Sequence, residues 1–513
     1  MSFVEFLAWA GVCFITLRAC QNLIHLGKNI QLFTKIKWSK ADGVTLSRHY
    51  YLIIPVLREQ AVIGDTLRHF AQLSGSNQSF SIIVVTTKRE SLDHYANRNR
   101  LGSLAKDIWH QSSAAKICDD YAGVFDRNTL EQLSGLDGSL QTIVEQVKDV
   151  HDSYVLTNQL ALSVAEEINA VTRPGFVKVV EYPKKIGVVA HQINFAIRSI
   201  DELRTKDYIG IYNADSRPPV QTLLEVEKLV SAKKTLPPII QQSSLFMLNV
   251  NDVRSEGYSW KANAFLQSLW TLKHEVTMLR LQSRHSGKIG SSSSLLARMW
   301  HARFTVCTCH GLFINSDYYR STPLLEEVTV EDTSYGLLQC LNRVPVMPLY
   351  VLENSESPNS LVKAIRQKRT WFRLVFDLSA LCRDAMRGKL KVVATKPEIC
   401  SLALQIIPLY VMWFLHSIVT VLPFIVAIVT FNVTLLVGWL CATVLYWVVP
   451  AFIMNANLKT LVGQESLGAW QFTKIIFFGI PGVFSHSVGP WLGVYDGIRK
   501  KLGFQVEKKK TER

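Results

Sequence analysis

The sequence predicts a membrane-anchored α/β protein, in which a domain with a mostly parallel central sheet is flanked by transmembrane helices. Two observations lead to this fold class. Hydrophobic residues make up 48% of the 513-residue chain, and the apolar excess lies at the two ends, which predicts membrane segments there. Between the ends, residues 45–360 alternate strand-like and helix-like runs, which is the pattern of an α/β domain.

An apolar run within residues 1–27 predicts the first membrane segment. Only Glu5 and Arg18 interrupt it before Cys20, and lysines follow it between residues 28 and 40. The basic residues come after the apolar stretch and no small-residue cleavage site is evident, so we expect an uncleaved anchor rather than a signal peptide. The basic flank places the following domain on the cytoplasmic side.

The C-terminal part is assigned to the membrane and its surface. Residues 401–454 are long enough for two spans of about 20 residues each, with a break near residues 430–432. Basic residues on both flanks of this hairpin predict cytoplasmic ends. Residues 473–495 contain prolines and glycines that break a simple helix, so a re-entrant segment is favoured and an additional span is the alternative. Interfacial helices at residues 361–400 and a basic cytoplasmic tail at residues 496–513 complete the prediction.

Charge and cysteine usage narrow the class of protein. The net charge of +15 beside apolar spans favours anionic lipid and cytoplasmic orientation, and no nucleic-acid-reading motif is present. Nine scattered cysteines predict a reducing compartment. Cys307, Cys309 and His310 are the tightest group, but they lack a second ligand pair for zinc, so buried or incidental residues are favoured. A transporter would need polar groups in several spans, and only His416 and Asn432 are obvious candidates.

The first half of the α/β domain predicts a nucleotide-binding sheet. Residues 50–56 are an apolar run, residues 61–73 have helical spacing and residues 81–85 are β-branched, which together predict a strand–helix–strand unit. Residues 91–170 are polar and helix-prone, and we interpret them as a helical insertion. Further strands are predicted at residues 176–180, 208–212 and 239–243.

A strand that ends in a carboxylate is the clearest sign of chemistry. Asp215 follows an apolar strand and precedes turn residues, which places it in the crevice where open α/β sheets bind ligands. There it can hold a hard divalent cation that bridges phosphates. The alternative is an ordinary turn residue. The segment from Lys185 to Asn194 comes directly before this strand and adds a cation, a glycine and an amide.

Two polar segments follow downstream. Glu331 and Asp332 lie in a polar loop before a predicted helix at residues 335–341. The alternative for Asp332 is a helix N-cap. Residues 367–371 combine an amide, basic residues and a tryptophan, and the alternative for this stretch is an amphipathic helix at the membrane surface.

These motifs, in this order, resemble the family 2 glycosyltransferases, particularly the membrane-bound branch that includes cellulose, chitin and hyaluronan synthases. The matching motifs are the opening strand at residues 53–59, the D-x-D metal motif at residues 213–215, the catalytic acidic pair at residues 331–332 and the Q-x-x-R-W motif at residues 367–371. The resemblance spans roughly residues 48–400.

The resemblance implies a GT-A fold, a nucleotide-sugar donor and inversion by in-line displacement. Asp215, assisted by Asn213, would hold Mg²⁺ or Mn²⁺ against the donor diphosphate. Asp332, with Glu331 beside it, would take the proton from the attacking hydroxyl. The predicted donor-binding residues are Pro55, Glu59, Lys185, Asn194, Asp215, Gln367 and Arg369.

On the acceptor side the resemblance implies that Trp371 offers an aromatic face to the acceptor sugar. Gly311 allows close approach of the backbone to a ligand, and a plain turn is the alternative there. The chain also departs from the family pattern. Residues 86–90 lack the acidic pair that holds the nucleobase, Asn213 adds no charge to the metal motif, and Thr370 replaces the arginine of Q-x-x-R-W.

We therefore expect an integral membrane glycosyltransferase of a bacterial-type inner or plasma membrane, with its catalytic domain in the cytoplasm. A UDP-sugar is the first expected donor, and a growing polysaccharide or a polyprenyl-linked lipid is the expected acceptor. The altered Q-x-x-R-W motif favours single transfer and the general layout favours a synthase, so processivity is open. Oligomer or secretion partners are left open. The alternative function is a non-catalytic scaffold of a polysaccharide assembly or secretion complex, against which the retained carboxylates argue.

Overall fold

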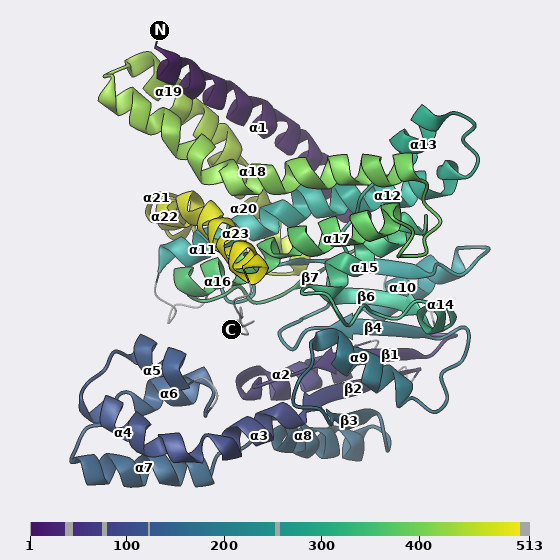
Figure 1. Ribbon diagram of the computed structural model, residues 1–513. Helices are drawn as coiled ribbons and strands as arrows, with labels where there is room; N and C mark the ends of the chain where they lie inside the picture. The colour runs from purple at the N-terminus through teal and green to yellow at the C-terminus, as the bar shows by residue number, and fades with distance from the viewer. Residues whose placement is uncertain (1, 36–44, 74–78, 122–123, 252–256, 503–513) are drawn as a thin grey trace. The chain divides into compact units, whose positions relative to one another are not determined.

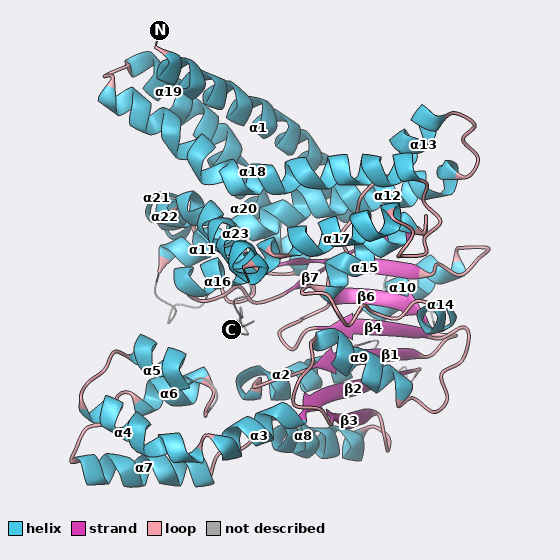
Figure 2. Cartoon of the chain, in the orientation of Figure 1, coloured by secondary structure: helices cyan, strands magenta, loops and turns pink. Residues whose placement is uncertain are grey.

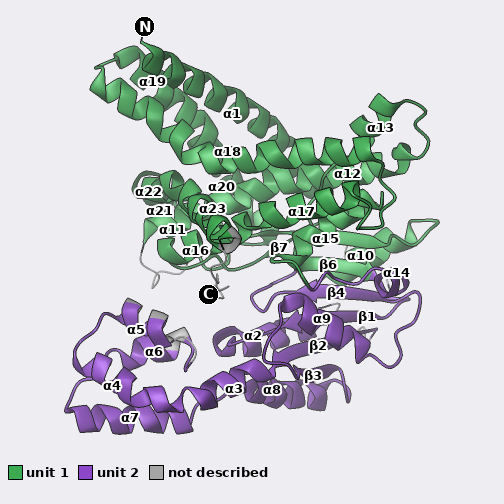
Figure 3. Cartoon of the chain, in the orientation of Figure 1, with its two compact units in different colours: residues 1–44, 221–314, 327–513 green, residues 45–220, 315–326 purple. Residues whose placement is uncertain are grey.

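The computed structural model describes residues 2–35, 45–73, 79–121, 124–251 and 257–502. They form a mixed α/β fold with seven strands, mostly in parallel pairs, together with long apolar helices (Figures 1 and 2). The predicted α/β class with mostly parallel strands is confirmed. The chain divides into two compact units (Figure 3). We call residues 45–220 with 315–326 the sheet unit, and residues 1–44 with 221–314 and 327–513 the membrane unit.

The sheet unit contains four parallel strands in the order β3-β2-β1-β4. They are β1 (Tyr50–Pro55), β2 (Phe80–Thr87), β3 (Val177–Tyr182) and β4 (Tyr208–Tyr212). β4 is buried at every position and β2 at nearly every position, as expected for apolar parallel strands that are covered on both faces. α9 (Val189–Arg198) packs on β1 and β2, whereas α2 (Gln60–Ala71) packs against α8 (Thr157–Val171).

Short helices fill the long connection between β2 and β3. They are α3 (Lys88–Ala96), η1 (Arg98–Arg100), α4 (Leu101–Trp109), α5 (Ala114–Tyr121), α6 (Arg127–Leu133) and α7 (Leu140–Asp152), followed by α8. α4 to α7 enclose a small core of their own, in which Leu104, Leu130 and Val147 are fully buried. This core explains how a polar, helix-prone segment stays ordered, because it buries its apolar positions within itself. The unit also includes α14 (Ser316–Ser321).

The membrane unit has a smaller set of strands. β5 (Ile239–Leu245) pairs antiparallel with β6 (His310–Asn315) and parallel with β7 (Val346–Asn354). The helices around them are α10 (Thr222–Ser231), α11 (Tyr258–Trp270), η2 (Thr271–Glu275), α12 (Val276–Ile289), α13 (Leu295–His301), α15 (Glu331–Leu341), α16 (Leu361–Phe372) and α17 (Leu374–Met386). The π-helical turn η2 joins α11 to α12 without a break.

Three helices of the described residues are long and apolar enough to cross a membrane. They are α1 (Phe3–Lys35), α18 (Lys396–Val429) and the continuous helix Val433–Val462, which comprises α19 (Val433–Thr443), η3 (Val444–Val448) and α20 (Val449–Val462). Each exceeds the roughly 20 residues that a bilayer core requires. α18 ends before a turn at Phe431, which has a positive φ of 49°, and Asn432 then caps α19 by accepting from the N–H of Leu435 at 2.9 Å.

A bent pair of helical segments follows these spans. They are α21 (Ala469–Phe478), α22 (Ile480–Phe484), η4 (Ser485–Ser487) and α23 (Val488–Lys501). The bend between Ala469–Phe478 and Ile480–Arg499 is 49°, so the pair forms either a broken fourth span or a re-entrant segment.

The long helices pack through one face and expose apolar side chains on the other. Ala8, Ile15 and Leu435 belong to the shared core of α1, α18 and α19. By contrast, Leu17 of α1 and Val429 of α18 are each 71% exposed. Apolar surface of this extent is costly in water and favourable in lipid. The three long apolar helices are therefore consistent with a membrane protein.

Glycines at every fourth position allow α23 to pack closely on α16. A Cβ atom at Gly489 would lie 2.6 Å from the Cβ of Lys368, and one at Gly493 would lie 3.0 Å from the carbonyl oxygen of Arg369. Gly497 approaches the ring of Phe376 in the same way. Small residues at this spacing let two helix backbones approach, as in small-xxx-small contacts of membrane helices.

Gly489→Ala is therefore expected to lower stability by about 1–3 kcal/mol, because its methyl group would overlap backbone and Cβ atoms of α16. The matched control is Gly27→Ala in α1, where no heavy atom lies within 4 Å of an added Cβ. Thermal unfolding of the purified protein in neutral detergent measures both. Equal melting temperatures for the two variants would contradict the close packing of α23 on α16.

Candidate functional site

Asp215 lies directly after β4 in the sheet unit, at the carboxyl end of the parallel strands. Asp215 is only 4% exposed. The N–H of Ser216 donates to the carbonyl of Asn213 at 3.2 Å, and the hydroxyl of Thr66 on α2 donates to the carbonyl of Ala214. These contacts fix the turn that carries the carboxylate. Open α/β sheets bind ligands at this end of their strands.

The loop after β1 lies at the same end of the sheet. Pro55 is the last residue of β1, and Arg58 adopts a positive φ of 54°. The N–H of Arg58 donates to Glu90 at 3.1 Å, and the N–H of Glu59 donates to the hydroxyl of Thr157 at 3.1 Å. Glu90 follows β2, so its carboxylate fixes the loop that follows β1.

Two of the predicted donor-binding residues of the sheet unit have different environments. Lys185 lies 3.6 Å from Asp93, which also pairs with Arg58 at 2.8 Å. Lys185 therefore reaches the loop after β1. Asn194 lies on α9 and accepts a hydrogen bond from the hydroxyl of Tyr319, so its side chain links α9 to α14. The donor-binding role of Asn194 stays a prediction.

Asp332 lies in the first turn of α15, within the membrane unit. Its carboxylate accepts from the backbone N–H of Cys309 at 3.0 Å and from the N–H of Thr333 at 2.6 Å. Burial raises the pKa of Asp332, and this effect outweighs the two backbone hydrogen bonds and nearby His310, which lower it. Glu331 precedes it on the same turn and is 8% exposed. A carboxylate with a raised pKa is a stronger base than an ordinary aspartate.

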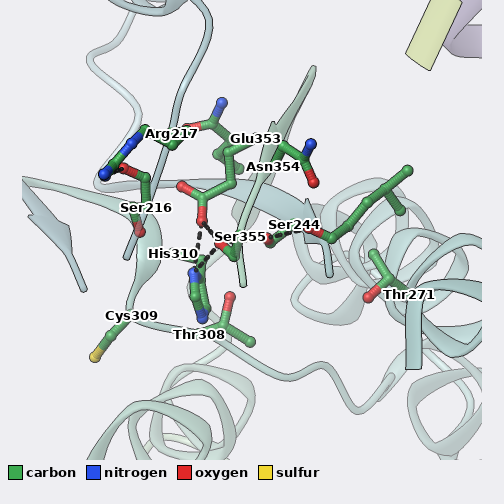
Figure 4. Close-up of polar contacts among 12 residues, drawn as sticks. Ser216, Arg217, Ser244, Thr271, Thr308, Cys309, His310, Glu353, Asn354 and Ser355 are labelled. Atoms are coloured by element: carbon green, nitrogen blue, oxygen red, sulfur yellow. Dashed lines mark hydrogen bonds and ion pairs between the residues drawn. The ribbon is translucent and has the colours of Figure 1, made fainter. Parts of the chain in front are cut away.

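Next to Asp332 the chain buries a polar network (Figure 4). His310 Nδ1 lies 2.5 Å from Glu353 Oε1, and the hydroxyl of Ser355 donates to the same carboxylate at 2.7 Å. The hydroxyl of Ser244 donates to Ser355 at 2.9 Å. Burial alone would lower the pKa of His310, but the adjacent carboxylates, Glu353 first, raise it overall. His310 is therefore held toward its charged form.

Glu275 adds a further buried acid to this region. It lies in the π-helical turn η2, is 3% exposed, and accepts from the hydroxyl of Thr271 at 3.4 Å. Burial raises the pKa of Glu275 to about 7. Its charge acts on His310 and Asp332. The region thus combines three carboxyl groups with one imidazole. Burial raises the pKa of Asp332 and of Glu275, and the adjacent carboxylates raise the pKa of His310.

Gly311 has a structural requirement of its own. Its φ is +71°, and a Cβ atom there would overlap the side chain of Gln242 on β5. The Gln242 side chain of β5 therefore occupies the space that the missing Cβ of Gly311 leaves. Its predicted place on the acceptor side stays a prediction.

The residues predicted on α16 have mixed environments. Gln367 is buried, and Trp371 is half-buried. The guanidinium of Arg369 forms a bidentate ion pair with Asp496 of α23, in which Nε donates to Oδ2 at 2.6 Å. Arg369 is thus engaged with α23 in this structure, which makes α16 a packing element of the membrane unit as well as a candidate site element.

The predicted metal ligands form a small donor set. Within the residues that the structure describes, no three His, Cys, Asp or Glu side chains are arranged to hold a metal ion. Asp215 offers a carboxylate, and Asn213, two residues earlier on the same turn, offers an amide oxygen. This set fits Mg²⁺ or Mn²⁺, because these cations commonly take one or two protein oxygens and complete their shell with phosphates and water.

Sequence reasoning did not identify Glu275 and Glu353 as site residues. Glu353 is fully buried in β7, and its signal was a single acid at the end of an apolar strand. Glu275 is buried in an otherwise ordinary helical stretch, and no pattern pointed to it. The sequence raised His310 as a metal ligand or as part of the acceptor floor, but it did not indicate the pairing of His310 with Glu353.

Comparisons with known proteins give a likeness among solved structures. No family model matches the chain, and no curated protein matches it. Among solved structures, a mannosyltransferase from Pyrobaculum calidifontis, in complex with GDP-mannose and Mn²⁺, aligns with 96% of this chain and 99% of its own. The sequence identity is 12% and the TM-score is 0.41. At that level the likeness does not establish a shared fold or activity.

Glu353→Gln is expected to destabilise the protein by about 3 kcal/mol near pH 6, because it leaves a buried imidazolium without its carboxylate. The pKa of His310 is raised in the folded state. Its contribution is therefore complete below about pH 6.5 and is lost as the pH rises through the folded pKa.

Thermal unfolding near pH 6 and near pH 9 measures this effect, and the deficit of Glu353→Gln should shrink at the higher pH. Glu465→Gln is the control, because the Glu465 side chain is 75% exposed. A deficit that is the same at both pH values would argue against a charged His310.

Proposed function

We propose that this chain is a membrane-bound glycosyltransferase that transfers a sugar, with inversion, from a nucleotide-sugar donor to an acceptor presented at the cytoplasmic face. The observation that carries the proposal is Asp332, a partly buried carboxylate of raised pKa, held by two backbone N–H groups at the start of α15. An oriented carboxylate of this kind suits a general base. Its position in the unit that also contains the apolar spans supports an acceptor associated with the membrane.

In the proposed reaction Asp332 accepts the proton of the acceptor hydroxyl as that oxygen attacks the anomeric carbon of the donor sugar. The N–H groups of Cys309 and Thr333 keep the carboxylate in one orientation. Glu331 and the helix N-terminus shape the local potential, and His310 lies within range to act on the charge of Asp332. The sugar–phosphate bond breaks, and the nucleoside diphosphate leaves.

On the donor side Asp215 and Asn213 would hold the divalent cation, which neutralises charge on the leaving diphosphate when bound. Lys185 and the loop from Pro55 to Glu59 would bind the nucleotide. This assignment is supported by the position of these residues at the carboxyl end of the parallel strands. A UDP-sugar is the first donor to test, and a growing polysaccharide or a polyprenyl-linked lipid is the proposed acceptor.

Asp332→Asn is expected to reduce release of nucleoside diphosphate by about 10²–10⁴-fold, because the amide keeps the shape and the hydrogen-bond acceptor of the carboxylate but is not a base. The assay uses protein in nanodiscs with Mn²⁺, a panel of UDP- and GDP-sugars, and membrane extract as acceptor.

Asp384→Asn is the matched control, because the side chain of Asp384 is 41% exposed in the same unit. Silence of the unmodified protein across the whole panel would favour the non-catalytic scaffold. Full activity of Asp332→Asn would remove Asp332 from the mechanism.

Asp215→Ala is expected to abolish metal-dependent nucleotide binding and leave folding intact, because Asp215 supplies the one carboxylate of the proposed metal set. Calorimetric titration of UDP with Mn²⁺ present or chelated measures the effect, and we expect at least a tenfold loss of affinity. Asp201→Ala, at an exposed carboxylate of the sheet unit, is the control. Metal-dependent binding that survives in Asp215→Ala would assign the metal to other residues.

A further inference from the structure

The membrane unit buries a group of basic side chains that comes from several of its helices. Lys273 of η2 is 5% exposed, and Lys368 of α16 is 4% exposed. The ammonium of Lys368 lies 2.9 Å from Nδ1 of His486 in η4 and also donates to Asn263. His416 of α18 follows, with its ring centroid 5.0 Å from that of His486. We call Lys273, Lys368, His416 and His486 the basic cluster.

Aromatic residues complete the surroundings of the basic cluster. The ammonium of Lys273 lies 5.3 Å from the ring centroid of Tyr446, which in turn lies 5.7 Å from the ring of His416. The ring of Trp413 lies near that of His486, with a centroid distance of 5.9 Å and a tilt of 36°. The cluster is therefore one continuous feature that joins η2, α16, α18, η3 and η4.

Within the described residues the lysines of the basic cluster have no carboxylate partner, unlike several partly exposed arginines of this unit. Arg298 and Arg343 pair with Glu398, and Arg369 pairs with Asp496. Within the described part of the chain, by contrast, neither cluster lysine forms an ion pair. Burial lowers the pKa of Lys273 and of Lys368 to about 7, with Arg18 adding to the effect at Lys273. A buried ammonium group without a counter-charge is costly, and a bound anion within the cluster lowers that cost.

Unused hydrogen-bond donors are present at the same place. Trp413 Nε1 and His416 Nδ1 are both inaccessible to solvent, and neither finds a hydrogen-bond partner among the described residues. The indole N–H can only donate, so it requires an acceptor. Ammonium groups, an indole N–H and an imidazole together match the oxygen atoms of a phosphate.

The location of the cluster indicates where that phosphate comes from. His416 and Trp413 belong to α18, which is a candidate membrane span. α18 also exposes apolar side chains that suit lipid chains, such as those of Leu404 and Val411. A phosphate attached to a lipid can present its headgroup to the cluster and keep its chain in the bilayer.

We propose that the basic cluster binds the phosphate group of a membrane lipid. The inference rests on the proposed function where it identifies this lipid as the carrier of the acceptor, whose sugar hydroxyl then reacts at Asp332. Binding of the phosphate itself requires neither a donor nor a metal. The two claims are therefore separable by experiment.

The test titrates the purified full-length protein in neutral detergent with octyl phosphate, octanol and inorganic phosphate, without nucleotide or metal, and follows binding by calorimetry and by ³¹P NMR. We expect octyl phosphate to bind at least about tenfold more tightly than inorganic phosphate, and octanol not to compete. Equal affinity for inorganic phosphate would identify free phosphate as the ligand and overturn the lipid assignment. No binding of octyl phosphate would overturn the proposal altogether.

Variants separate binding from folding. Lys368→Met should weaken binding of octyl phosphate at least about tenfold without lowering the melting temperature of the ligand-free protein, because it removes an uncompensated buried charge. Trp413→Phe removes the indole N–H together with the volume of one ring, and it should weaken binding about threefold to tenfold. Lys459→Met, whose side chain is 71% exposed, is the control. Unchanged affinity in both cluster variants would contradict the assignment.

Comparison with catalysis distinguishes failure of this inference from failure of the proposed function. Release of nucleoside diphosphate without binding of octyl phosphate would reject the lipid site alone. Binding of octyl phosphate by a protein that is silent toward every donor would support the site and reject the transferase.

Discussion

Buried ion pairs determine how the helices of the membrane unit assemble. Glu398, in the first turn of α18, accepts hydrogen bonds from Arg298 of α13 and from Arg343 after α15. Asp496 of α23 accepts from Arg369 of α16. Each pair joins segments that are far apart in the sequence, and a charge left alone in the interior would cost several kcal/mol. The helices can therefore satisfy these charges in few arrangements, and the glycines of α23 permit the approach that one of the pairs requires.

The same constraint produces the chemistry of the candidate site. His310 lies against Glu353, and its pKa rises because a buried carboxylate favours the imidazolium. Asp332 has backbone N–H partners rather than a cation in direct contact, so burial raises its pKa instead. A charge-paired group stabilises the fold, whereas an incompletely compensated carboxylate retains affinity for a proton. Like Asp332, the lysines of the basic cluster form no ion pair among the described residues. We infer a ligand for them on that ground.

The fold was predictable where the signal was local. The strand at residues 208–212 was predicted with the bounds that β4 has, and the turn at residues 430–432 separates α18 from α19 as expected, because apolar runs and turn residues act over a few positions. The environment of Arg369 could not be predicted, since its partner is more than a hundred residues away. Single buried acids such as Glu353 likewise leave no periodic pattern. Pairing across long sequence separation decides the site, and one sequence does not contain that information.

A shared core connects the proposed base to the membrane. Leu337 and Leu341 of α15 pack in one apolar cluster with Leu402 and Ile406 of α18. α15 begins with the turn that carries Asp332, so the shared cluster connects the helix of this carboxylate to α18, a candidate span. Close-packed interiors transmit displacement rather than absorb it. Under the proposed function this packing would hold the base at a constant depth relative to the bilayer. A lipid-borne acceptor requires such a depth, because its own anchor would hold its reacting hydroxyl at the membrane surface.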